Sequence, residues 1–249
     1  MLTPERHRII LDLLLEKEVV KLQELVDATS SSESTIRRDL SQLEEERKLK
    51  RVHGGASLLK QKGVELSVIE KSTKNLNEKE LITKYAASLI KKGDCIFLDA
   101  GTTTFQMIQH INAKDIKVVT NGLTHLEALL DKGIHTYLTG GYIKGITKAL
   151  IGRGALEGIM TYRFDKCFIG VNGIHTALGY TTPDPEEAMV KKMAIDLSQE
   201  SFILSDSTKF NEVTFSKIAE LKQGVIITND IDDEIIAPFM EQTKIKVVK

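Results

Sequence analysis

The chain has 249 residues, 41% of them hydrophobic and 28% charged, an ordinary balance for a globular protein with room for two domains. Its formal net charge of −1 excludes the strongly basic surface of a nonspecific nucleic-acid binder. No apolar run approaches the roughly 18 residues needed to cross a bilayer, and residues 1–7 are too polar for a signal peptide, so we expect a cytoplasmic protein without membrane contact.

Two short helices are predicted at the start of the chain. Thr3 and Pro4 are a favoured cap and first residue of a helix that would extend to about residue 17. The apolar stripe of this helix consists of Ile9, Ile10, Leu13 and Leu14. A second, shorter stripe consists of Leu22, Leu25 and Val26.

A third helix is predicted after the serine run at residues 30–32. Ser30 or Ser32 can cap it, and Ser30 with Glu33 fits a capping box. At 100° per residue, the face that must point into the core consists of Ile36, Leu40 and Leu43. The outward face consists of Ser34, Thr35, Arg37, Arg38, Ser41 and Gln42.

These outward side chains have the chemistry that reads DNA. Arginine can pair with guanine, glutamine with adenine, and hydroxyls with base edges or phosphates. Ser34, Thr35 and Arg38 lie near the helix N-terminus, which is the end that a helix-turn-helix inserts into the major groove. The alternative is a small helical interaction domain whose outward face is only solvated.

A basic β-hairpin, or wing, is predicted directly after this helix. Residues 47–60 hold five lysine or arginine residues and no acid. Leu49 and Val52 can pack on the core, Gly54 and Gly55 supply the turn, and the outward side chains are Lys48, Lys50, Arg51 and His53. Such a strand pair can contact the DNA backbone or minor groove, although His53 is as well explained by stabilising the turn.

Residues 34–40 (Ser-Thr-Ile-Arg-Arg-Asp-Leu) and 50–56 (Lys-Arg-Val-His-Gly-Gly-Ala) resemble the N-terminal signature of the DeoR family of bacterial transcriptional repressors. The resemblance spans the head without a gap. It implies that residues 1–57 form a winged helix-turn-helix that binds double-stranded operator DNA. Two heads of a homodimer or homotetramer would occupy half-sites about one helical turn apart, or multiples of it.

The remaining sequence predicts a linker and then an α/β domain. Residues 58–75 are polar without a clean period, and a helix that includes residues 81–90 follows them. Candidate strands are residues 95–99, 117–120, 136–139, 166–171, 202–205, 225–228 and 245–248, with helices such as residues 123–130 and 185–197 between them. This alternation predicts that residues 76–249 form a mostly parallel sheet with helices on both faces, which binds ligands at the carboxyl ends of its strands.

Small polar residues follow the first of these strands and precede a helix from about Phe105. The loop would offer free N–H groups, three hydroxyls and the positive end of the helix dipole, as a phosphate cradle does. Its candidate ligands are Asp99, Gly101, Thr102, Thr103 and Thr104. The alternative is a threonine cap on a tight turn.

Similar loops follow the other strands. Lys209 adds a point charge suited to phosphate, and the remaining candidates are Thr120, Asn121, Gly140, Gly141, Asn172, Gly173 and Asp206. Five loops of this kind at one edge favour a small-ligand site over ordinary strand-end turns.

Asp184 opens a predicted helix and allows two interpretations. As a cap, with Pro185 at the first helical position and Glu187 at the third, it needs no ligand. Glu186 and Lys191 remain available for sugar hydroxyls or for a carboxylate–lysine pair, and ligand contact is a second role for this segment, Asp184 included.

The body also resembles the sensor domain of the DeoR family, through residues 99–103, 119–121, 140–141 and 206–210 together with Asp165 and Gly173. Thr208 stands where the family usually has serine, which keeps the hydroxyl. The resemblance implies a fold related to ribose-5-phosphate isomerase and glucosamine-6-phosphate deaminase, with a phosphorylated sugar as the effector. Residues 1–7 and 183–188 are most similar to the fructose-operon branch, which makes fructose 1-phosphate the leading effector.

The rival hypothesis is a sugar-phosphate isomerase with an appended DNA-binding domain. Its candidate bases by location are Asp99, Asp165, Asp184 and Glu186, but no pair among them has a catalytic spacing. We therefore expect a regulator rather than an enzyme, and the residues themselves do not distinguish a repressor from an activator. Cys95 and Cys167 lie in apolar runs and are expected to be buried thiols, so we expect no metal and no cofactor.

Overall fold

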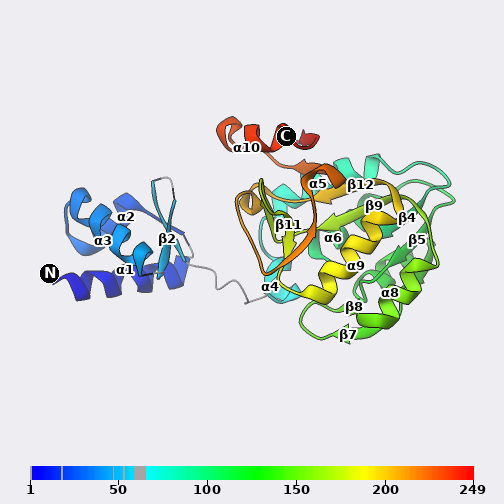
Figure 1. Cartoon of the computed structure of the whole chain (residues 1–249), viewed down its shortest axis with the longest axis horizontal. Helices are drawn as coiled ribbons and strands as arrows, with labels where there is room; N and C mark the ends of the chain where they lie inside the picture. Colours follow the sequence, from blue (N-terminus) through cyan, green and yellow to red (C-terminus); the bar gives the residue numbers. More distant parts are fainter. Residues whose placement is uncertain (1, 18, 47, 53, 59–65) are drawn as a thin grey trace. The chain divides into compact units, whose positions relative to one another are not determined.

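A computed structural model of the chain describes residues 2–17, 19–46, 48–52, 54–58 and 66–249. It divides into two compact units, which are residues 1–61 and residues 62–249 (Figure 1). We call them the head and the body and describe each by itself.

The head is a three-helix unit with a small antiparallel sheet. Its helices are α1 (Thr3–Lys17), α2 (Leu22–Thr29) and α3 (Glu33–Glu45). Strands β1 (Val19–Lys21), β2 (Leu49–Val52) and β3 (Gly55–Leu58) pair in the order β1-β3-β2. The core consists of Ile10, Leu14, Val20, Leu25, Ile36, Leu40, Leu43, Leu49 and Ala56. The predicted core face of α3 is therefore confirmed, and β2 with β3 is the predicted wing.

Four details of the head differ from prediction. Thr3 is the first residue of α1 rather than its cap, since the Leu2 carbonyl accepts from the Glu5 and Arg6 N–H groups. Ser32 caps α3 by accepting from the Thr35 N–H, whereas Ser30 ends α2 in the left-handed region at φ 50°, so the Ser30–Glu33 capping box is wrong. Val52 is 37% exposed because the core covers only the start of β2. The fourth difference is β1, a strand that the sequence did not reveal.

The body is built on a seven-stranded, fully parallel sheet. Its strand order is β15-β14-β12-β9-β4-β5-β6. The strands are β4 (Cys95–Leu98), β5 (Lys117–Thr120), β6 (His135–Leu138), β9 (Phe164–Gly170), β12 (Ser198–Leu204), β14 (Val225–Thr228) and β15 (Ile245–Val247). All seven predicted strands are thus present in one sheet, with bounds that differ by up to four residues.

Helices cover both faces of this sheet (Figure 1). Side chains of α5 (Leu76–Ser88), α6 (Thr102–His110) and α7 (His125–Asp131) contribute to the core on one face. Those of α8 (Gly152–Met160), α9 (Pro185–Asp196) and α10 (Asp233–Met240) contribute to the core on the other. The predicted α/β class is confirmed, and α6 begins three residues earlier than expected.

Several short elements of the body were not predicted. They are the hairpin of β7 (Tyr142–Lys144) and β8 (Ala149–Ile151), the sheet of β10 (Gly173–His175), β11 (Gly179–Thr182) and β13 (Ser216–Ala219), and two 3₁₀ turns, Ser207–Lys209 and Leu221–Gln223. Helix α4 (Val68–Ser72) lies inside the expected linker, residues 58–75, with Ser67 and Glu70 in a capping box. Each is too short to leave a clear periodic pattern.

Candidate functional site

The polar face of α3 and the wing form one surface on the head. A shallow hollow there is lined by Arg37, Arg38, Ser41, Gln42, Glu45 and Arg51, so the fold brings together five of the residues predicted to contact DNA. Arg38 is exposed, and its side chain makes no hydrogen bond or ion pair with any residue that the structure describes. Its guanidinium is therefore available for an external partner.

The neighbours of Arg38 have partners inside the head. Arg37 pairs with Glu33 at 2.6 Å, and the Gln42 side-chain amide donates to Glu46 at 3.0 Å. These contacts are between exposed side chains and contribute little stability, so DNA can replace them. The Ser34 and Thr35 hydroxyls lie 3.0 Å and 2.8 Å from the capping hydroxyl of Ser32.

The wing is fixed against α3 by side-chain contacts. The Arg51 guanidinium donates to the Ser41 hydroxyl at 2.8 Å, and the Arg51 backbone N–H donates to Glu44 at 2.8 Å. Lys48 and Lys50 are exposed as predicted, and Lys48 pairs with Glu46 at 2.6 Å. His53 lies outside the described residues.

A buried contact that the sequence analysis missed locks α1 to α3. Asp39 is 4% exposed and accepts two hydrogen bonds from Arg6, at 2.7 Å and 3.0 Å, and lies 3.3 Å from His7 Nε2. Although burial opposes it, the Arg6 guanidinium holds the pKa of Asp39 below its usual value. Asp39 is part of the helix that faces outward through Arg38, so this lock sets the orientation of that helix.

The predicted ligand residues of the body converge at one edge of the sheet. Because all seven strands are parallel, the loops after β4, β5, β6, β9 and β12 meet at their carboxyl ends. These loops carry every predicted strand-end residue. Asp165, a candidate base of the rival isomerase, lies at the start of β9, at the opposite edge, where its carboxylate accepts from the Cys95 N–H at 2.8 Å, so it is not part of the candidate site.

The N-terminus of α6 has the properties of an anion site. Gly101 is the N-cap residue and provides no side-chain cap, so the first-turn N–H groups of Thr102, Thr103 and Thr104 face the loop. The Thr104 hydroxyl is used internally, since it donates to the Asp99 carbonyl at 2.6 Å and contacts buried His125.

Cationic side chains gather at this helix end. Lys79 of α5 is only 5% exposed, and its ammonium lies 3.2 Å from the Thr102 hydroxyl. Burial lowers the pKa of Lys79, the Asp206 charge raises it, and the Lys209 charge lowers it again. The Lys209 charge and hydrogen bonds from Thr208 keep the pKa of Asp206 below its usual value although it is buried. Lys79 was missed because a lysine on a helix is usually solvated.

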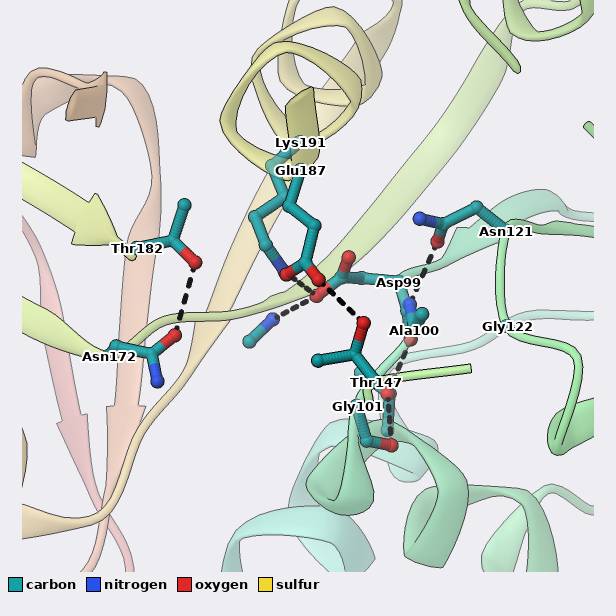
Figure 2. Close-up of polar contacts among 12 residues, drawn as sticks. Asp99, Ala100, Gly101, Asn121, Gly122, Thr147, Asn172, Thr182, Glu187 and Lys191 are labelled. Atoms are coloured by element: carbon teal, nitrogen blue, oxygen red, sulfur yellow. Dashed lines mark hydrogen bonds and ion pairs between the residues drawn. The ribbon is translucent and has the colours of Figure 1, made fainter. Parts of the chain in front are cut away.

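A buried ion pair lies beside this cluster. Lys191 of α9 and Asp99, which directly follows β4, are 4% and 0% exposed, and the Lys191 ammonium donates to Asp99 Oδ2 (Figure 2). Gly170 N–H also donates to this oxygen, at 3.0 Å. The other oxygen, Oδ1, is buried without a hydrogen-bond partner among the described residues. Burial raises the pKa of Asp99, and Lys191 opposes that rise.

The N-terminus of α9 is tied to the β7–β8 hairpin. Glu187 is buried, and its Oε1 accepts from the Thr147 hydroxyl at 2.7 Å (Figure 2). The same oxygen accepts from the Lys144 ammonium at 3.1 Å. Asp184 caps α9 and pairs with Lys144 at 2.8 Å. Capping of α9 is thus confirmed, while the exposed side chain of Glu186 keeps an external partner possible.

Other predicted ligand residues have internal partners. The Thr120 hydroxyl donates to the Leu98 carbonyl at 2.6 Å, and Asn121 accepts from the Ala100 N–H at 2.8 Å. Gly141 has φ 104°, and a Cβ there would lie 2.5 Å from the Ile151 carbonyl oxygen. At Gly173 the corresponding approach is 2.4 Å to the Glu212 carbonyl oxygen, and Gly140 also has positive φ, 77°. These residues shape the loops rather than present free side chains.

Asn172 is oriented toward the site from a neighbouring loop. Its Oδ1 accepts from the Thr182 hydroxyl at 3.1 Å, which leaves its NH₂ group to donate elsewhere (Figure 2). No cluster of histidine, cysteine or acidic residues able to hold a metal ion occurs in the part of the chain that the structure describes.

Both units match known family models. Residues 6–62 match the DeoR-like helix-turn-helix domain, and residues 74–230 match the DeoR C-terminal sensor domain. The chain belongs to the DeoR family. As a DeoR-family member it is a DNA-binding transcriptional regulator, as the sequence predicts.

Full-length relatives are regulators by name. The chain is 51% identical to the HTH-type transcriptional regulator FruR of Bacillus subtilis, over 100% of both chains. It is 34% identical to the lactose phosphotransferase system repressor of Staphylococcus epidermidis, over 90% of both. These relatives support a regulator and not an enzyme.

Solved structures share part of the fold. Ribose 5-phosphate isomerase A of Methanocaldococcus jannaschii has 15% identity and a TM-score of 0.41, covering 54% of each chain. The delta subunit of eIF2B from Chaetomium thermophilum has 16% identity and a TM-score of 0.46, covering 61% of this chain and 55% of that one.

None of the helices formed by the described residues has both the length and the apolar character to cross a membrane.

Proposed function

We propose that this regulator represses a sugar-utilisation operon from the cytoplasm and that a phosphorylated sugar, with fructose 1-phosphate as the leading candidate, releases it from operator DNA. The phosphate would bind at the N-terminus of α6, and the sugar would extend toward Asp99, Asn172 and Glu186. The active form would be a homodimer or homotetramer whose heads bind two half-sites.

The observation that carries this proposal is the positive charge at the N-terminus of α6, where buried Lys79 lies beside the first turn of the helix. The open first turn of a helix favours an anion, and here it lies beside Lys79, which is buried. A buried ammonium is costly unless it is paired, so an incoming phosphate gains a charge-assisted contact. Lys209 would add a second positive charge from the adjacent loop.

The sugar end is supported by the unpartnered oxygen of Asp99. A buried acceptor without a donor gains more from a hydroxyl than a solvated acceptor does, because it has already lost its water. Asp99 lies three residues before Thr102, the first residue of α6, so one ligand can contact both residues. The ion pair with Lys191 fixes the orientation of the carboxylate.

The choice of effector rests on resemblance. Residues 183–188 and 1–7 are most similar to the fructose-operon branch. The name of the staphylococcal relative, which mentions lactose and repression, supports repression of a sugar system.

Calorimetric titration of the full chain tests the binding. Fructose 1-phosphate should bind and fructose should not, because only the phosphate carries the negative charge that the positive N-terminus of α6 attracts. Binding of another sugar phosphate instead would change the operon but keep the mechanism. Binding of no sugar phosphate by folded protein would overturn the proposal.

A lysine substitution tests the phosphate position. Lys209→Ala should weaken fructose 1-phosphate binding by roughly 10- to 100-fold, since a charged hydrogen bond is lost, and should give a repressor that stays on its operator. The exposed Lys222, changed to alanine, is the matched control and should bind normally. Normal induction in Lys209→Ala would remove this lysine from the site.

A further inference from the structure

Helix α4 is held at both ends by the body. At its start, the Val68 N–H donates to the Ile146 carbonyl, in the connection between β7 and β8, at 3.2 Å. At its end, the Lys71 carbonyl accepts from the Lys79 ammonium at 2.5 Å. Along the chain, α4 is the first described helix after the segment that leads away from the head.

The contact at the C-terminal end of α4 uses Lys79, which also lies at the N-terminus of α6. The Lys79 ammonium that binds the Lys71 carbonyl also lies 3.2 Å from the Thr102 hydroxyl in the first turn of α6. An ammonium has three N–H donors, and these two contacts use two of them. An anion at α6 would therefore act on the same group that holds the last turn of α4.

The N-terminal contact leads to the other side of the candidate site. Lys144 and Thr147 of the hairpin region are bonded to Glu187 in the first turn of α9. One turn further, Lys191 is paired with Asp99. A ligand that moves Asp99 or Lys191 therefore acts on α9, and through Glu187 on the hairpin that holds the start of α4.

We propose that α4 is the element that transmits effector binding toward the head, with Lys79 acting on its last turn and the β7–β8 hairpin on its first. This inference rests on the proposed function, since it assumes a phosphorylated ligand at α6. A ligand shifts an equilibrium only through different affinities for two arrangements. Here the arrangements differ in whether Lys79 and the hairpin hold α4.

A change in α4 that avoids both ligand contacts separates transmission from binding. Ser67 caps α4: its hydroxyl accepts from the Glu70 N–H at 3.3 Å, and its own N–H donates to Glu70 at 2.8 Å. Ser67→Ala removes the cap and loosens a helix of only five residues. Ser72→Ala is the matched control, because the Ser72 hydroxyl only donates to the Ile69 carbonyl within the same helix.

The measurement is the operator dissociation constant of the full chain with and without saturating fructose 1-phosphate. Ser67→Ala should reduce the ratio of the two constants about fivefold or more, the scale of a typical allosteric coupling. Its affinity for fructose 1-phosphate without DNA should stay within about twofold of the unmodified chain, and Ser72→Ala should keep the full ratio.

A wild-type ratio in folded Ser67→Ala would overturn the role of α4. Hydrogen exchange on the unmodified chain gives a second test, in which fructose 1-phosphate or inorganic phosphate should change the exchange of amides 68–74. Binding without any such change would also overturn it, while leaving the proposed function intact. Failure of the unmodified chain to bind either probe would remove both proposals.

Discussion

His125 has a buried imidazole next to the first turn of α6. It is fully buried, its Nε2 lies 3.1 Å from the Thr104 hydroxyl, and burial lowers its pKa to about 4. The unfolded chain takes up a proton near pH 6.5, whereas the folded chain does so only near pH 4. Stability is therefore full above about pH 6.5 and falls as the pH drops toward 4.

We expect the free energy of unfolding of the body to be about 2 kcal/mol lower at pH 5 than at pH 7.5 from this group alone. Urea unfolding followed by tyrosine fluorescence measures it, because all five tyrosines lie in the body. His125→Gln should flatten the pH dependence, while the same change at exposed His135 should not. An equally steep dependence in His125→Gln would assign it to other groups.

Individual site residues could be predicted only where a local pattern carried them. Ser34 to Gln42 were assigned to a face by helical period alone, and Lys209 by its place after a strand. Lys79 and Glu187 could not be, because their partners are remote in sequence: Thr102 is 23 residues from Lys79, and Thr147 is 40 from Glu187. Capping explained Glu187 completely, which hid its role in holding the hairpin.

At the scale of elements, α3 is held by side-chain contacts to both α1 and the wing. The bonds from Arg6 to Asp39 fix it to α1, and those from Arg51 to Ser41 and Glu44 fix the wing to it. None of these contacts involves Arg38, so its substitution tests a DNA contact rather than a structural residue.

Arg38→Ala should weaken operator binding by about 100-fold or more, because each of two heads loses a base contact worth 1–3 kcal/mol. Its affinity for sugar phosphate should be unchanged. Gel-shift titration with the operator measures the effect, and Arg8→Ala, at an exposed position of α1, is the matched control. Loss of both affinities would mean that Arg38→Ala unfolds the chain.

Helix α8 is positioned by close backbone contact. A Cβ at Gly158 would lie 1.9 Å from the Thr139 carbonyl oxygen, in the loop after β6. Gly158→Ala should therefore lower the stability of the body by about 1–3 kcal/mol. Gly145→Ala, with no atom within 4 Å of its Cβ, should not. Thermal unfolding by circular dichroism compares them, and equal midpoints would show that α8 shifts without cost.

The long elements were predictable and the short ones were not. The strands of the central sheet are β-branched runs, and α3 has three apolar residues at helical spacing. The hairpin β7–β8 and the strand β1 have only three residues per strand, which is too few to establish a period. Val52 was misplaced because alternation along a four-residue strand does not reveal where the core ends.

At the scale of the whole molecule, the proposed homodimer or homotetramer constrains the operator. We expect two protected half-sites separated by about 10 base pairs or a multiple of it, since both heads must approach one side of the duplex. Footprinting measures the spacing, and insertion of about five base pairs between the half-sites should abolish tight binding. Undiminished binding after that insertion would mean that the heads act independently.

The strand order of the sheet also means that the head can fold before the body does during synthesis. The head closes its core with pairings inside its first 61 residues, whereas the central strand β9 pairs with β4 across about 70 residues, as Lys166 with Ile96, and also pairs with the later strand β12. The complete head therefore emerges from the ribosome well before all strands of the body have been synthesised. A frameshift or premature stop between β6 and β12 would produce a folded head without a complete body. No sugar phosphate could then regulate the DNA binding of that head.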